Sequence, residues 1–142
     1  MIIDCHGHYT TAPAAHQRFR DAQLAGIKDP GAPPAQTEMI SDDEIRETIE
    51  TNQLKLQKLR GADLTVFSPR ASAMGHHQGS EAVSTAWTRA CNDLIHRVVN
   101  LYPDNFSGVC QVPQHPGRPV DGSIRGLARC VTGLGVVGCN LN

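Results

Sequence analysis

The sequence predicts an α/β fold with a parallel sheet, built as the N-terminal half of a (β/α)₈ TIM barrel. Short apolar runs alternate with stretches of helical periodicity in the order β-α-β-α-β-α-β, which is typical of parallel strands with right-handed crossovers. Polar clusters follow the strands, where barrel enzymes build their sites. The 142 residues supply four strands, whereas a complete barrel needs about 250 residues. We therefore expect one partial domain over residues 1–142. A small four-stranded sheet is the alternative, and the end of the chain inside its last predicted strand argues against it.

The first half of the chain should contain one strand and one clear helix. Residues 1–8 read as the strand, and residues 10–39 after it are polar and irregular, with a short helix expected over Ala14 to Ala25. That irregular segment is either a lid over a site or a plain surface insertion. The clear helix begins at Ser41 with the capping box SDDE and ends near Gly61. Its apolar face should consist of Ile45, Ile49, Leu56 and Leu59.

The second half should add two strand–helix units and a last strand. Strands are predicted over residues 63–68, 106–112 and 136–142, and proline stops the first two. A helix capped by Ser80 carries apolar residues at helical spacing, among which Trp87 is interpreted as a core residue. A further helix is expected over residues 123–134, with the inward side chains Ile124, Leu127, Val131 and Leu134.

Composition narrows the possible functions. The formal net charge is -1, which gives no reason to expect binding to nucleic acid or to an anionic membrane surface. No apolar run is long enough to cross a bilayer, and Asp4 interrupts the N-terminal apolar run too early for a signal peptide. The five cysteines show no C-x-x-C spacing, so we interpret them as reduced thiols of a cytoplasmic protein.

The strongest chemical signal is the His-x-His sequence at the end of the first strand. Side chains alternate along a strand, so Asp4, His6 and His8 should share one face, and Cys5 and Gly7 the other. Two imidazoles on one face can bind one divalent metal ion, and a catalytic zinc keeps a further position open for water or substrate. The pattern alone is also compatible with two polar residues at a strand-to-loop boundary. Cys5 is interpreted as a packing residue.

Several stretches together carry a resemblance to a known family. Residues 1–11, which read MIIDCHGHYTT, resemble the opening of 4-oxalomesaconate hydratases in the amidohydrolase superfamily. Residues 25–30 (AGIKDP), 49–56 (IETNQLKL), 63–72 (DLTVFSPRAS) and 140–142 (NLN) are similar as well. The resemblance extends over essentially the whole chain and is far more specific than His-x-His alone.

This resemblance implies a metal-dependent (β/α)₈ barrel of the amidohydrolase type. It implies that His6 and His8 are the first two ligands of one zinc ion, and that the remaining ligands and the general base lie beyond Asn142. The implied activity is addition of water to the C=C bond of 4-oxalomesaconate in the catabolism of protocatechuate-type aromatic acids. The full-length protein would be cytoplasmic and homo-oligomeric. The chain by itself would lack activity.

A polycarboxylate substrate requires cationic and hydrogen-bonding residues, and the loop after the second strand offers them. Arg70 is the preferred partner of a substrate carboxylate, because its planar guanidinium makes two parallel hydrogen bonds. Ser72 and His77 could add donors, with His77 modestly preferred over His76. A solvated loop charge is the alternative for Arg70. Arg118, Arg125, Asn140 and Asn142 are weaker candidates.

Two other functional classes remain open. A related metal-dependent decarboxylase or hydrolase would use the same metal and barrel with a different reaction. An inactive truncated fragment would have no function of its own.

Overall fold

Four parallel strands form one sheet in the order β1-β2-β3-β4, so each strand pairs with its neighbour in sequence. The computed structural model describes residues 1–29, 31–70 and 74–141. The strands are β1 (Ile3–His8), β2 (Leu64–Ser68), β3 (Phe106–Gln111) and β4 (Gly138–Asn140). The predicted four-stranded α/β architecture is confirmed, with strand ends within a few residues of the expected ones.

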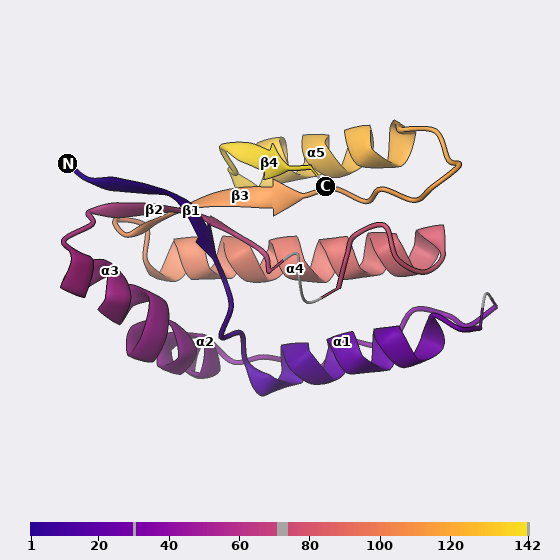
Figure 1. The fold of residues 1–142 in the computed structure, drawn as a ribbon, viewed down its shortest axis with the longest axis horizontal. Coiled ribbons are helices and arrows are strands. Elements are labelled where there is room, and N and C mark those ends of the chain that lie inside the picture. The colour runs from indigo at the N-terminus through magenta and orange to yellow at the C-terminus, as the bar shows by residue number, and fades with distance from the viewer. Residues whose placement is uncertain (30, 71–73, 142) are drawn as a thin grey trace.

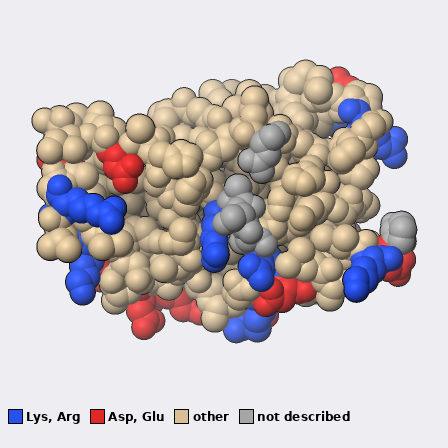
Figure 2. Space-filling view, in the orientation of Figure 1, with Lys and Arg blue, Asp and Glu red and all other residues tan. Residues whose placement is uncertain are grey.

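The helices are α1 (Ala14–Gly26), α2 (Asp42–Thr48), α3 (Leu54–Arg60), α4 (Glu81–Leu101) and α5 (Asp121–Leu134), and a π-helical turn, η1 (Ile49–Gln53), joins α2 to α3. Helix α4 packs along β3 and β2, and α1 packs against α4, so α4 lies between the sheet and α1 (Figure 1). Charged side chains of both signs gather mainly along the lower edge of the face in Figure 2, and the area above is mostly uncharged.

Local sequence explains the helix ends. Ser41 accepts a hydrogen bond from the Glu44 amide, and the Glu44 carboxylate accepts one from the Ser41 amide, which is the expected capping box. The Ser80 side chain caps α4 by accepting a hydrogen bond from the Val83 amide. Gly61 ends α3 with a left-handed φ of 69°, a conformation that glycine adopts without steric cost.

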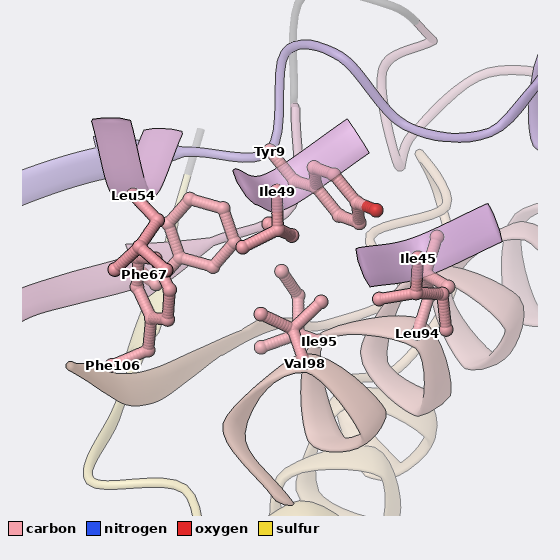
Figure 3. Packing of buried hydrophobic residues seen from close by; sticks show 9 residues of the cluster. All are labelled: Tyr9, Ile45, Ile49, Leu54, Phe67, Leu94, Ile95, Val98 and Phe106. Carbon is pink, nitrogen blue, oxygen red and sulfur yellow. The ribbon is translucent and has the colours of Figure 1, made fainter. Parts of the chain in front are cut away.

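The main core lies where β1, β2 and β3 face α2, the π turn, α3 and α4. Figure 3 shows its nine side chains converging from these elements: Tyr9, Ile45, Ile49, Leu54, Phe67, Leu94, Ile95, Val98 and Phe106. A second cluster around Trp87 joins α1 to α4, so the expectation that Trp87 is a core residue is confirmed. In a third cluster, α5 packs against β3 through the buried residues Cys110, Val112, Cys130 and Val136.

Three expectations about packing are wrong. Leu56 and Leu59 are 45% and 78% exposed. The π turn before α3 contains one residue more than an α-helical turn, so α3 is rotated and Leu54 and Gln57 become its buried residues. Ile124 and Val131 are 60% and 50% exposed, since α5 rests on the sheet along Leu127, Cys130 and Leu134.

Cys5 is the third. Its side chain is exposed, as are the other three of the first four residues of β1.

Candidate metal centre

The imidazoles of His6 and His8 meet at the carboxyl end of β1. Their Nε2 atoms are 3.0 Å apart, and the two rings are almost perpendicular, with centroids separated by 4.6 Å. Two nitrogen ligands of a tetrahedral zinc ion lie about 3.3 Å apart when each Zn–N bond is about 2.0–2.1 Å. The two Nε2 atoms are therefore close to the spacing of two ligands of one metal ion, and the two side chains share a face of β1 as the strand alternation predicts.

Strand β2 fixes the orientation of His8. The Nδ1 atom of His8 lies 3.1 Å from the Pro69 carbonyl oxygen and 2.7 Å from Ser68 Oγ, whose own proton is donated to the Gly7 carbonyl. Because a carbonyl oxygen only accepts, this geometry assigns the ring proton to Nδ1, and the lone pair of His8 Nε2 then faces His6 Nε2 at 3.0 Å, where a cation could replace their mutual contact. A hydrogen bond of this kind orients metal-binding histidines in many proteins.

Gly7 is needed for packing between the two histidines. A Cβ at this position would lie 2.3 Å from Cγ2 of Thr65 and 3.3 Å from the Phe67 ring. The register between β1 and β2 also shifts between Asp4 and Gly7. The close approach of β2 therefore requires glycine here, on the face of β1 opposite the imidazoles.

Tyr9 continues the strand into the core. Its side chain is 3% exposed, and burial raises the pKa of its phenol to about 12, so the hydroxyl stays protonated. The hydroxyl lies 2.6 Å from Thr48 Oγ1 in α2. The residue that follows His8 is thus anchored to a helix, whereas the imidazoles themselves are exposed or half-buried.

The described residues contain no cluster of three or more histidine, cysteine or acidic side chains able to hold a metal ion. Structural zinc takes four protein ligands and catalytic zinc takes three. His6 and His8 therefore fit as one part of a ligand set and leave at least one further protein ligand to be supplied.

The proposed substrate residues are only partly described. Arg70 is exposed and directly follows Pro69, whose carbonyl holds His8, and Ser72 lies outside the described residues. His77 is exposed and lines a separate cavity of about 540 Å³ with Gln114, His115 and Arg118, on the loops after β2 and β3. Arg70 thus lies just after β2, next to the carbonyl that contacts His8, whereas His77 lines a cavity together with residues that follow β3.

His76 stands out more than the sequence suggests. It is 1% exposed, and both of its ring nitrogens lack a hydrogen-bond partner within the described chain. Burial, and next the neighbouring charge of His77, lower the pKa of His76, which favours its neutral form. A histidine pair alone does not reveal which member is buried, so sequence reasoning could not separate them.

Comparison with known proteins shows to which family this chain belongs. The amidohydrolase family model matches residues 3–142. The chain belongs to this amidohydrolase family. None of the described helices of this amidohydrolase is long and apolar enough to cross a membrane.

Two relatives cover the full length of this chain. It is 58% identical over 142 residues to a 2-keto-4-carboxy-3-hexenedioate hydratase of Sphingobium sp., and it spans 41% of that protein. The crystal structure of 4-oxalomesaconate hydratase from Rhodopseudomonas palustris matches with a TM-score of 0.88 and 50% identity, over 100% of this chain and 41% of that one. The resemblance to 4-oxalomesaconate hydratases and the half-barrel architecture are therefore confirmed.

More distant structures share the fold alone. A dihydroxybenzoic acid decarboxylase from Polaromonas sp., solved with bound manganese, has 21% identity and a TM-score of 0.65 over 99% of this chain and 38% of its own. The chain thus corresponds to the N-terminal part of barrels more than twice its length.

Proposed function

We propose that this protein is a zinc-dependent hydratase that adds water to 4-oxalomesaconate, in the breakdown of protocatechuate-type aromatic acids. The observation that carries the proposal is the facing pair of Nε2 atoms of His6 and His8, 3.0 Å apart, in a chain 58% identical to a named hydratase. Because the chain spans 41% of that relative, the activity belongs to the protein in its full length. We further propose a cytoplasmic location and a homo-oligomer.

The residues of this chain have separate tasks in that reaction. The Nε2 atoms of His6 and His8 would hold the metal, and Ser68 and the Pro69 carbonyl keep the proton of His8 on Nδ1. A bound zinc ion supplies Lewis acidity, which lowers the pKa of water or polarises a conjugated carbonyl. Arg70 would bind a substrate carboxylate, Ser72 and His77 would add donors, and the general base would come from elsewhere in the full-length protein.

Metal analysis of histidine variants tests the metal centre. His6→Ala and His8→Ala should each weaken zinc affinity of the full-length protein by more than about a hundredfold, because replacing even an outer-shell partner typically costs 10–100-fold. The control is His96→Ala, a histidine on α4 that hydrogen-bonds the Leu134 carbonyl. Wild-type stoichiometry and affinity in both strand variants would exclude these ligands. Product analysis with the wild type distinguishes hydration from decarboxylation or hydrolysis.

A second experiment tests Arg70. Arg70→Ala should lower kcat/KM for hydration by roughly ten- to a few-hundredfold, because a charge-assisted hydrogen bond contributes about 1.5–3 kcal/mol. Arg70→Lys should recover part of the loss, since an ammonium cannot make the bidentate pair. Zinc content should stay unchanged. Arg60→Ala, another exposed arginine on α3, is the control, and equal kinetics of Arg70→Ala and this control would identify Arg70 as a solvated loop charge.

A further inference from the structure

The π turn Ile49–Gln53 contacts the segment that follows His8. The Thr11 hydroxyl donates a hydrogen bond of 2.7 Å to Gln53 Oε1 and lies 3.3 Å from the Thr48 carbonyl oxygen. The Gln53 amide donates to Thr10 Oγ1 at 3.1 Å. Together with the Tyr9–Thr48 contact, all three residues after His8 are therefore attached to one short stretch of helix.

The widened turn explains why Thr48 and Gln53 can act together. In an α-helix, residues five apart point about 140° away from each other, since each residue rotates the chain by about 100°. In a π turn the hydrogen bonds run over five residues, so residues five apart return to nearly the same side. The extra residue thus brings the Gln53 side chain to the same side as the Thr48 side chain, so that Gln53 contacts Thr10 and Thr11 while Thr48 contacts Tyr9. The same turn directs Ile49 and Leu54 into the core.

The backbone transmits this support to His8. The Thr10 amide donates to the His8 carbonyl at 2.9 Å, and the Tyr9 amide donates to the Ser68 carbonyl at 2.9 Å. The His8 ring is held from the other side by Ser68 and Pro69. His8 therefore sits between β2, which holds its ring, and a loop that the π turn holds.

We propose that Thr48 and Gln53 are positioning residues for the metal centre, and that the π turn exists in this chain to hold Tyr9–Thr11 against them. They do not touch the imidazoles. They restrict the backbone after His8, so that Nδ1 stays on the Pro69 carbonyl and Nε2 stays opposite His6. This inference rests on the proposed metal centre where it is tested by zinc affinity. It does not depend on the metal where it is tested by the state of the His8 ring in metal-free protein.

The first readout is metal affinity of the full-length protein. Gln53→Ala should lower zinc affinity by about tenfold, at the lower end of the 10–100-fold typical of outer-shell partners. Gln53→Glu should remain near wild type, because both threonine hydroxyls can donate to a carboxylate. Thr51→Ala is the matched control: it lies in the same turn, and its exposed hydroxyl bonds the Glu47 carbonyl instead of the loop.

The second readout is the state of the His8 ring in metal-free protein, followed by NMR of ¹⁵N-labelled histidine. The Nδ1–H form of His8 should dominate in wild type and in Thr51→Ala, and should become mixed in Gln53→Ala. Equal zinc affinity and equal His8 signals in Gln53→Ala and Thr51→Ala would overturn the proposal, as would a lower Tm in Gln53→Ala without either change. If wild type bound no zinc but Gln53→Ala still made the protonation of the His8 ring mixed, the proposed metal centre would be refuted. Thr48 and Gln53 would then remain positioning residues of the His8 ring.

Discussion

At the scale of single residues, the placement of the His6–His8 pair depends on Gly7, whose packing contacts lie on the opposite face of β1. Alternation along β1 is enough to predict that His6 and His8 share a face, because it needs only local sequence. The partners that orient His8, Ser68 and Pro69, lie 60 and 61 residues away in sequence and become visible only once β1 and β2 pair. The need for Gly7 likewise arises from Thr65 in the neighbouring strand.

Gly7→Ala tests this close approach. The added Cβ would overlap Cγ2 of Thr65, whose Oγ1 accepts a hydrogen bond from Gln57 and resists displacement, so the free energy of unfolding should fall by about 1–3 kcal/mol. Zinc affinity should fall as well, because β1 must move. Thr65→Ser removes the methyl group and keeps the hydroxyl. Chemical denaturation should therefore show recovery in the Gly7→Ala, Thr65→Ser double variant, and a double variant no more stable than Gly7→Ala would contradict the steric explanation.

At the scale of elements, helix ends could be predicted and a change of helical register could not. Ser41, Ser80 and Gly61 mark helix ends through side-chain caps and a left-handed glycine, and these signals are local. A constant 3.6-residue period assigns Leu56 and Leu59 to the buried face. No residue of the stretch IETNQ signals a π turn by itself, since the turn is stabilised by contacts with Tyr9–Thr11 that form only in the folded chain.

Replacing leucines of α3 by alanine tests which face of this helix is buried. Leu54→Ala should lower the free energy of unfolding by about 2–5 kcal/mol, because Leu54 is 6% exposed within the main core. Leu59→Ala, at 78% exposure, should change the free energy of unfolding by less than about 0.5 kcal/mol. Equal losses in the two variants, measured by urea denaturation, would show that α3 presents the face expected from an uninterrupted α-helix.

At the scale of the whole molecule, both outer strands of the sheet have one edge without a partner strand among the described residues. Large apolar side chains are exposed close to both of them: Ile2 and Ile3 at β1, and Val137 and Leu141 at β4. The relatives that this chain matches are more than twice as long. Strand order within the half-barrel follows from the βα alternation, whereas local sequence does not show what covers these edges.

These edges determine how the polypeptide 1–142 should behave when it is produced alone. Unpaired strand edges flanked by exposed apolar side chains favour association, and two histidines fall short of the three protein ligands of a catalytic zinc site. We expect mixed oligomers in size-exclusion chromatography with light scattering, a broad thermal transition by circular dichroism, weak zinc binding and no hydration activity. The full-length protein, measured in parallel, should give one sharp transition and bind zinc stoichiometrically. A monodisperse, catalytically competent monomer of residues 1–142 with a sharp transition would show that the four strands form a sufficient core and site without the rest of a barrel.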